Sequence, residues 1–500
     1  MHMKVQVLDL DAGGKTIVVL NSTDALNLGV YSLDRVIIET DTDSLTAVVN
    51  TSEKFVPQGV VAVFDEVREE LELTSGQWVE VKARSTLKSK QYIRHKLEGL
   101  ELTPEEIREI ITDVVNRNLN DLELTSFITA LYLKGLSIRE STALIEAMVE
   151  TGEVLSFGKM VCDKHSIGGI PGDKTSLLLV PVVASAGLLI PKTSSRAITS
   201  PAGTADRAEM LMPVNLDIDE MENVVTKTNG CLVWGGGLDL APAVDLLIQI
   251  EHPLNVDPLL LSSILSKKKS AGSTHVVIDI PTGSKAKVKT TEDAHRLKDQ
   301  FVHIGHQLQM AVQCGITLGE QPIGCCIGPS LEAREALSSF SKKNSDLLEK
   351  TAALTGILFS MVGKTQDVAA GVNLAKTLLH EKAEEKLREI IKAQGGDPDI
   401  TPDDLPVGGY TLPVLAEKTG TVRWINNSGL ARIAGAAGCP KDKGAGINLF
   451  KKLGDSVKKG DHLLEIIAEK SYKLTQAEKL AGQISLMGIV DRWEETILLD

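Results

Sequence analysis

Apolar runs alternate with glycine-rich loops and helical stretches from Val161 to about residue 400. The clearest apolar runs are Leu177–Val183, Cys231–Trp234 and His275–Ile280. A chain with this alternation folds most simply as helices that cover a mostly parallel sheet, with the glycines in the connecting loops. The pattern therefore predicts a central α/β domain over residues 159–400.

Three further segments complete the chain, whose 500 residues are too many for a single hydrophobic core. Residues 1–84 alternate apolar and polar positions in short runs between turns, which predicts a small β-rich N-terminal domain. Residues 85–158 carry helix start signals such as the capping box Thr103–Glu106, so we expect a helical domain there, completed by about 245–272. Residues 401–500 contain turn-rich β segments and predict an α+β C-terminal domain.

The composition argues against several classes of function. A formal net charge of −14 opposes binding to a polyanion, and an aromatic content of 3% leaves little stacking surface for single-stranded nucleic acid. Six cysteines are scattered without a C-x-x-C pair, which is not the pattern of a zinc site or of a disulfide framework. Neither a signal-peptide pattern nor an uninterrupted apolar run of about 18 residues is present. We therefore expect a cytoplasmic protein without nucleic-acid or membrane partners.

The first polar cluster, Asp163–Lys174, contains three glycines within five residues. The backbone of such a loop can approach a ligand closely, and its N–H groups can surround an anion. Lys164 adds a positive charge and Ser166 a hydroxyl. A tight, solvated turn explains a glycine-rich loop about equally well. His165, which lies between them, is either a general base or a packing and hydrogen-bonding residue.

The second polar cluster, Thr193–Asp206, places six Ser or Thr hydroxyls and Arg196 around a glycine. Hydroxyls and a guanidinium suit the geometry and the charge of phosphate oxygens. Because this cluster follows the first by about 30 residues, with one βα-like unit between them, a shared phosphate site explains the pair better than a Ser/Thr-rich surface loop. Further along, Ser263 and Lys267 are spaced four apart and can face one cleft, whereas the run Lys267–Lys269 is typical of a solvated helix face.

These clusters give the chain a resemblance to the thymidine/pyrimidine-nucleoside phosphorylase family. The K-H-S-x-G-G stretch of that family stands here as Lys164–Gly169, and its longer signature stands as Ser194–Glu209. Other matching stretches extend from about residue 85 to the C-terminus and include Cys231–Pro242, Ser263–Lys268, Pro322–Gly324 and Ala436–Lys459. The resemblance implies a pentosyltransferase with the nucleoside phosphorylase/phosphoribosyltransferase fold. Such an enzyme splits an N-glycosidic bond with inorganic phosphate and requires no metal or organic cofactor.

Three departures from the nucleoside enzymes imply a nucleoside 5′-monophosphate as the substrate. Pro171 is an extra residue in the glycine-rich loop, and the Arg with which nucleoside enzymes bind a pyrimidine carbonyl is not evident before Ser263. Residues 1–84 are a further addition, which the nucleotide-specific branch of the family uses for multimerisation. We therefore expect a homodimer or larger homo-oligomer that converts AMP, and also CMP and UMP, to free base and ribose 1,5-bisphosphate in nucleotide catabolism.

The same resemblance assigns the residues of the site. Inorganic phosphate is expected to bind Lys164, Ser166, Ser194 and Thr204. The nucleotide is expected to bind Gly169, Ser195, Arg196, Ala197, Ile198, Thr199, Ser200, Thr204, Ser263 and Lys287. Asp257 is the expected proton donor to the leaving base.

Three other functions fit parts of this pattern. A nucleoside phosphorylase acting on thymidine or uridine would share both polar clusters. An anthranilate-type phosphoribosyltransferase would share the fold, but it would use acidic residues to hold Mg²⁺ on a pyrophosphate. A nucleotide-sensing module would bind the nucleotide without turning it over.

Overall fold

The structure, a computed structural model, describes residues 1–500 except 85–86, 198–199, 255, 342–344 and 491–500. Its contacts divide the chain into two units. The first unit comprises Met1–Thr151 and Ala243–Pro258, and the second comprises Gly152–Pro242 and Leu259–Asp500.

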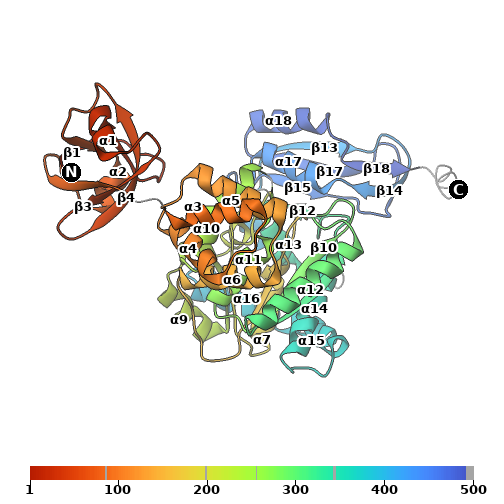
Figure 1. Ribbon diagram of the computed structural model, residues 1–500. Helices are drawn as coiled ribbons and strands as arrows, with labels where there is room; N and C mark the ends of the chain where they lie inside the picture. Colours follow the sequence, from red (N-terminus) through yellow and green to blue (C-terminus); the bar gives the residue numbers. More distant parts are fainter. Residues whose placement is uncertain (85–86, 198–199, 255, 342–344, 491–500) are drawn as a thin grey trace. The chain divides into compact units, whose positions relative to one another are not determined.

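The N-terminal residues close into a β-barrel with the strand order β1-β5-β2-β4-β3-β6, in which β6 pairs with β1 (Figure 1). Alternate residues point inward, so Val18 and Leu20 of one strand and Val36 and Ile38 of another are fully buried. Closure leaves no unpaired strand edge. The prediction of a β-rich N-terminal domain is therefore confirmed. The elements are β1 (His2–Val7), β2 (Ile17–Asn21), α1 (Ser22–Leu28), β3 (Arg35–Glu39), β4 (Ser44–Ser52), β5 (Val60–Val63), α2 (Asp65–Glu70) and β6 (Trp78–Ala83).

Helices make up the rest of the first unit. The predicted capping box forms, since the Thr103 side chain accepts from the N–H of Glu106 and the Glu106 carboxylate accepts from the N–H of Thr103. Glu140, in α6, is buried and accepts from the N–H of Leu102. It also pairs with Lys96 Nζ of α3 at 2.6 Å, and this ion pair ties α3 to α6. The helices are α3 (Lys88–Glu98), α4 (Pro104–Val115), α5 (Asp121–Lys134), α6 (Ile138–Glu150) and α10 (Pro242–Leu254).

Parallel strands form the centre of the second unit, in agreement with the predicted α/β domain. The strands β11, β10 and β7 pair in that order, β8 pairs with β9, and a parallel bridge between Val161 and Leu189 joins β7 to β8. The strands are β7 (Cys162–Ser166), β8 (Ile190–Ser194), β9 (Gly230–Trp234), β10 (His275–Thr282) and β11 (Ala311–Leu318). The helices around them are α7 (Thr175–Ser185), α8 (Thr204–Ala208), α9 (Ile218–Thr228), α11 (Leu260–Ser270), α12 (Thr291–Gln307), α13 (Pro329–Ser339), α14 (Asp346–Met361), α15 (Val368–Glu381) and α16 (Ala383–Ala393).

The C-terminal part of the second unit is α+β, as predicted. One of its sheets includes a strand from the middle of the chain. Strand β12 (Cys326–Ile327) pairs with β15 (Gly446–Leu449) in the sheet order β12-β15-β17-β13 (Figure 1). A second sheet has the order β16-β14-β18. The remaining elements are β13 (Tyr410–Leu415), β14 (Gly420–Ile425), α17 (Asn427–Ala437), β16 (Ser456–Val457), β17 (His462–Ala468), α18 (Ser471–Ala481) and β18 (Met487–Val490).

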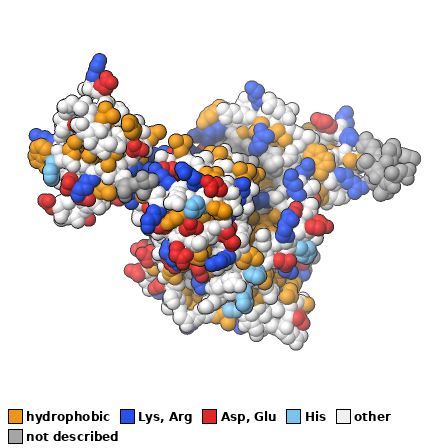
Figure 2. Space-filling view, in the orientation of Figure 1, with side chains coloured by type: hydrophobic (Ala, Val, Ile, Leu, Met, Phe, Trp, Pro, Cys, Tyr) orange, Lys and Arg blue, Asp and Glu red, His pale blue; other side chains and the backbone are white. Residues whose placement is uncertain are grey.

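Three properties of the described residues bear on possible partners: the surface charge, the length of the apolar helices and the grouping of potential metal ligands. Figure 2 shows Lys and Arg side chains interspersed with Asp and Glu side chains on the face in view, so charges of both signs share that face. Within the part of the chain that the structure describes, no helix is long and apolar enough to cross a membrane. Within the same residues, no three His, Cys, Asp or Glu side chains are grouped as the ligands of a metal ion would be.

The buried pair of Lys96 and Glu140 gives a test of the helical packing. Lys96→Met leaves the Glu140 carboxylate buried without its cation, so we expect the free energy of unfolding to fall by about 3 kcal/mol. Arg108→Met, which breaks an exposed pair with Glu150, is the control and should cost less than about 1 kcal/mol. Thermal unfolding of the two variants measures the difference, and equal melting temperatures would contradict it.

Candidate active site

Strands β7 and β8 end side by side in the central sheet. The bridge between Val161 and Leu189 aligns them, and β7 also runs parallel to β10. Strand β7 ends at Ser166 and β8 ends at Ser194, so both polar clusters follow the carboxyl ends of neighbouring parallel strands. The carboxyl ends of parallel strands are where α/β proteins bind their ligands.

The glycine-rich loop after β7 depends on backbone that other residues rarely adopt. Gly168, Gly169 and Gly172 have φ values of +79°, +88° and +79°. A Cβ on Gly169 would lie 2.9 Å from the backbone nitrogen of Lys287, so no larger residue fits there. The structure thus brings together Gly169 and Lys287, which were both predicted to bind the nucleotide. The Ser166 hydroxyl accepts from the N–H of Gly168 at 3.4 Å.

Lys164, the predicted phosphate ligand, belongs to a buried chain of alternating charges. Its Nζ lies 3.5 Å from Asp173 Oδ2, and Asp173 lies 3.6 Å from Lys350 Nζ. Lys350 in turn pairs with Asp279 at 2.7 Å. Burial opposes ionisation of Asp173, but Lys164 and Lys350 outweigh it and hold the pKa of this carboxyl well below its ordinary range. Lys164 is therefore held at the sheet edge by a carboxylate that stays charged at neutral pH.

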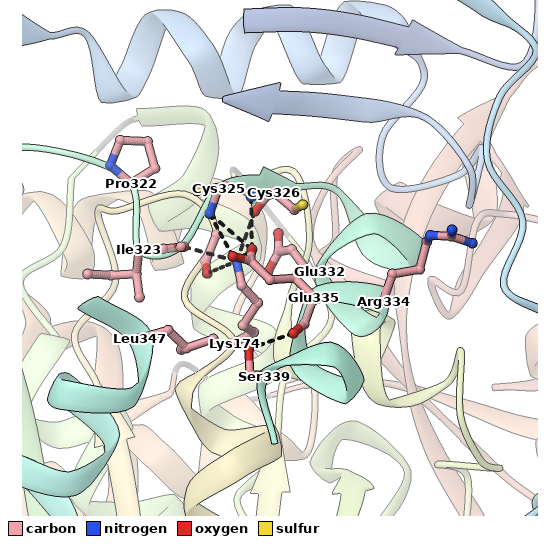
Figure 3. Close-up of polar contacts among 12 residues, drawn as sticks. Lys174, Pro322, Ile323, Cys325, Cys326, Glu332, Arg334, Glu335, Ser339 and Leu347 are labelled. Atoms are coloured by element: carbon pink, nitrogen blue, oxygen red, sulfur yellow. Dashed lines mark hydrogen bonds and ion pairs between the residues drawn. The ribbon is translucent and has the colours of Figure 1, made fainter. Parts of the chain in front are cut away.

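Lys174 fastens the end of the glycine-rich loop to a distant segment (Figure 3). Its fully buried Nζ donates to the carbonyls of Gly172, Ile323 and Cys326 at 2.9, 2.9 and 3.0 Å and pairs with Glu335 at 2.8 Å. Burial disfavours both charges, but their pairing keeps the pKa of Lys174 above and that of Glu335 below the ordinary values. Glu335 also accepts from the N–H of Cys326, so both ends of this ion pair hold backbone.

Arg196 shapes the second loop through protein carboxylates. Its guanidinium donates to Glu209 at 2.6 and 2.9 Å, reaches Asp206 at 3.5 Å and lies 5.3 Å from the centre of the Trp234 ring. The hydrogen bond from Arg196, together with the ion pair from Lys443, lowers the pKa of Glu209 to about 2. Since the guanidinium already has these partners, its contacts support a role in holding the loop, and its contact with the nucleotide stays a prediction.

Asp206 closes the same loop from inside. Its Oδ2 accepts from the N–H groups of Ala197 and Gly203 at 2.7 and 2.8 Å. A Cβ on Gly203 would lie 2.5 Å from the carbonyl oxygen of Ser195, so the loop is too tight there for any side chain. The backbone around Ser195 and Ala197 is therefore fixed by short-range contacts.

The remaining predicted residues of this loop lie along it. The Ser194 hydroxyl donates to the carbonyl of Val233 at 3.1 Å, and the Ser200 hydroxyl donates to that of Ala202 at 3.2 Å. Thr204 is the first residue of α8. Ile198 and Thr199 lie outside the described residues.

Ser263 and Asp257 fall in different units. Ser263 lies in α11, where its hydroxyl donates to the carbonyl of Leu260 at 3.2 Å. We expected 245–272 to complete the helical domain, yet α11 is grouped with the second unit and only the preceding helix with the first. Asp257 follows α10 and belongs to the first unit. The roles of both residues stay predictions.

The structure also reveals charged residues that the sequence did not suggest. Lys267–Lys269 were expected to form a solvated helix face, but this was wrong for Lys268, which is 1% exposed and pairs with Asp163 at 2.6 Å. Lys268, in α11, points inward to Asp163, the second residue of β7. Lys192, in β8, is 3% exposed and lies 3.9 Å from the same carboxylate. A lysine inside the strand IPKTS was the one sequence signal for this cluster.

The imidazole of His165 is close enough to these lysines for them to influence its pKa. Burial, and then the nearby lysines with Lys268 foremost, hold the pKa of its imidazole well below the ordinary range. The ring is therefore neutral at neutral pH. A neutral imidazole can accept as well as donate a hydrogen bond, so both roles weighed for His165 remain open.

Three regions of the chain match known domain families. Residues 90–152 match the helical bundle domain of the glycosyl transferase family, and residues 158–383 match its a/b domain. Residues 421–485 match the C-terminal domain of pyrimidine nucleoside phosphorylase. Together these matches confirm the predicted class of fold over the helical, central and C-terminal parts.

Proteins named AMP phosphorylase are similar to this chain over nearly its whole length. That of Thermofilum pendens is 47% identical over 96% of this chain and 93% of its own. That of Thermococcus kodakarensis is 45% identical over 96% of each, and that of Methanosarcina acetivorans is 45% identical over 95% of each. Among solved structures, anthranilate phosphoribosyltransferase from Thermus thermophilus has a TM-score of 0.51 and covers 61% of this chain and 99% of its own. At 19% identity, that similarity shows the fold alone.

The contacts of Lys174 predict a strong effect of a single substitution. Lys174→Met leaves Glu335 buried without its cation and removes three hydrogen bonds to carbonyls, so we expect the free energy of unfolding to fall by about 3–5 kcal/mol. Lys451→Met, at a partly exposed lysine 3.8 Å from Asp461, is the matched control and should cost less than about 1 kcal/mol. If denaturant unfolding shows the same stability for both variants, Lys174 does not anchor the loop.

Proposed function

Since this chain belongs to the AMP phosphorylase family, with relatives 43–47% identical over 95–97% of its length, we propose that it catalyses the phosphorolysis of AMP. The chain is a pentosyltransferase by that family membership. In the proposed reaction, inorganic phosphate replaces adenine at C1′ of the ribose and gives adenine and ribose 1,5-bisphosphate. The observation that carries the proposal is this full-length similarity, and two polar loops at one edge of a parallel sheet support it.

In the proposed reaction the protein stabilises the charges of the transition state and forms no covalent intermediate with the substrate. A phosphate oxygen forms a bond to C1′ while the bond from C1′ to the base nitrogen breaks, and the bonding electron pair leaves with the base. Positive charge develops on the ribose in the transition state, and the adjacent phosphate dianion stabilises it. The departing adenine takes a proton, for which we propose Asp257 as the donor.

The contacts around the two loops support the assignment of phosphate ligands. Lys164 is held at the sheet edge by Asp173, and the hydroxyls of Ser166 and Ser194 end the two strands. Thr204 begins the short helix after the second loop. We propose that these side chains bind inorganic phosphate, because a cation and hydroxyls at converging backbone ends suit its oxygens.

The nucleotide would bind alongside, by the backbone of the glycine-rich loop and by the second loop. The close approach of Gly169 to Lys287 supports a shared contact with the ligand. We assign the nucleotide to Gly169, Ser195, Arg196, Ala197, Ile198, Thr199, Ser200, Thr204, Ser263 and Lys287.

CMP and UMP are proposed as further substrates. A cytoplasmic location and a homo-oligomer formed through the barrel of residues 1–84 are part of the same proposal.

A pyrimidine nucleoside phosphorylase is the second candidate, because residues 421–485 match the C-terminal domain of that enzyme. The 5′-phosphate distinguishes the two functions. A site built for a phosphorylated nucleotide leaves its polar groups unpaired when the phosphate is missing, and such sites reject the smaller analogue strongly.

Release of free base from nucleotides and from nucleosides tests the proposed function. We expect phosphate-dependent release of adenine from AMP to be about 100-fold or more faster, in kcat/KM, than release from adenosine. CMP and UMP, with cytidine and uridine as matched controls, show whether other bases are accepted. Faster turnover of uridine or thymidine than of any nucleotide would favour the nucleoside phosphorylase instead.

Asp257→Asn tests the proposed proton donor. The amide cannot supply a proton, so we expect kcat to fall by about 100- to 10,000-fold while the dissociation constant for AMP changes little. Asp121→Asn, at an exposed carboxylate paired with Lys15 in the same unit, should leave kcat unchanged. Unchanged turnover in Asp257→Asn would remove this residue from the mechanism.

A further inference from the structure

Lys192 lies in a place where a lysine is costly. Its side chain is 3% exposed, in strand β8, two residues before the proposed phosphate ligand Ser194. Side chains two apart on a strand point to the same face. Lys192 Nζ donates to the carbonyl of Thr193, and the carboxylate nearest to it, that of Asp163, is 3.9 Å away.

The Asp163 carboxylate already has other hydrogen-bond and ion-pair partners. Lys268 Nζ lies 2.6 Å from Asp163 Oδ2, and the Ser273 hydroxyl donates to the same oxygen at 3.1 Å. The N–H of Lys164 donates to Asp163 Oδ1 at 2.7 Å. The negative charge of Asp163 is therefore compensated by Lys268, and little of it is left for Lys192.

The buried charges around Lys192 are unequal in number. Among the described residues, the ion pairs here join the cations Lys164, Lys192, Lys268 and Lys350 to the carboxylates Asp163, Asp173 and Asp279. Lys192 has the longest of these contacts. A buried charge without a counter-ion is destabilising, so such a group either gives up its proton or is paired by an incoming ligand.

The groups that face Lys192 favour its neutral form in the absence of a ligand. Lys268 from α11 and Lys164 from β7 repel its charge, and Asp163 is the facing carboxylate. Burial and then Lys268 hold the pKa of the Lys192 ammonium well below its ordinary range. The facing His165 is itself kept neutral, and burial raises the pKa of the Cys231 thiol on the neighbouring strand, so neither supplies a negative charge at neutral pH.

We propose that Lys192 adjusts the charge of the phosphate site, being a neutral amine when the site is empty and taking one proton from solvent when a dianion binds beside Ser194. The inference rests on the proposed function for the place where phosphate binds. The incoming dianion supplies the missing counter-charge, the amine becomes an ammonium, and the site gains affinity without burying an unpaired charge beforehand. Lys192 is thus a positioning residue for the anion rather than a catalytic one.

Proton uptake on binding of inorganic sulfate tests the proposal. Sulfate is a dianion that does not titrate near neutral pH, so protons taken up during its binding come to the protein. Calorimetric titrations in two buffers with different heats of ionisation give the number of protons. We expect wild-type uptake to reach a maximum between the pKa values of Lys192 in the free and bound protein, and to vanish at lower pH, where the amine is already protonated.

Two variants separate charge from structure. Lys192→Met should abolish the uptake and raise the sulfate dissociation constant by about tenfold. Lys192→Arg, which is charged at all accessible pH values, should bind sulfate without proton uptake and with a flatter pH profile. Lys451→Met, at a lysine of the C-terminal domain, is the control and should behave as wild type.

The outcomes distinguish this inference from the proposed function. Wild-type protein that splits AMP with phosphate but binds sulfate without proton uptake would overturn the role of Lys192 and leave the function standing. The same conclusion follows if phosphate binds and sulfate does not, since charge adjustment acts on any dianion. Protein that neither binds phosphate nor splits AMP would instead refute the proposed function.

Discussion

Buried lysines with too few carboxylate partners lie in and beside β7 and β8, the strands that lead into both polar loops. The chain as a whole has a formal net charge of −14, so attraction for a phosphate compound must come from local groups. Lys164 and Lys268 supply that local charge from inside the domain, where solvent screens it little, and Lys192 adds to it once an anion binds. The burial that strengthens their effect also requires Asp163 and Asp173 as partners. The rest of the central domain holds these few charges in place.

Other ion pairs extend that support into the C-terminal part of the chain. Lys174 and Glu335 bind the backbone of the segment that leads into β12, which then pairs with β15. At the start of that segment, Lys452 donates to the carbonyls of Pro322 and Gly324. Lys443, from the same C-terminal part, reaches Glu209, which also holds Arg196 of the second loop. The C-terminal part therefore contributes to the shape of both loops through backbone and carboxylate contacts.

Local signals in the sequence predicted the features that local contacts determine. The capping box at Thr103–Glu106 forms as its spacing indicates, and the apolar run Leu177–Val183 lies within α7. The buried state of Lys268 could not be found in this way, because its partner Asp163 is 105 residues away and its neighbours in sequence are also lysines. The pairing of β12 with β15 was missed for the same reason, since it joins segments more than 100 residues apart. Which loops bind phosphate was suggested by glycine and hydroxyl content, whereas the charge balance beneath them depends on tertiary contacts.

A crystal structure of the protein with inorganic phosphate and AMP would test the account most directly. We predict that phosphate lies at the shared edge of β7 and β8, in contact with Lys164, Ser166, Ser194 and Thr204, with the nucleotide on the glycine-rich loop. Phosphate bound away from both loops, with Lys164 in contact only with Asp173, would contradict the central claim that these buried lysines form an anion site.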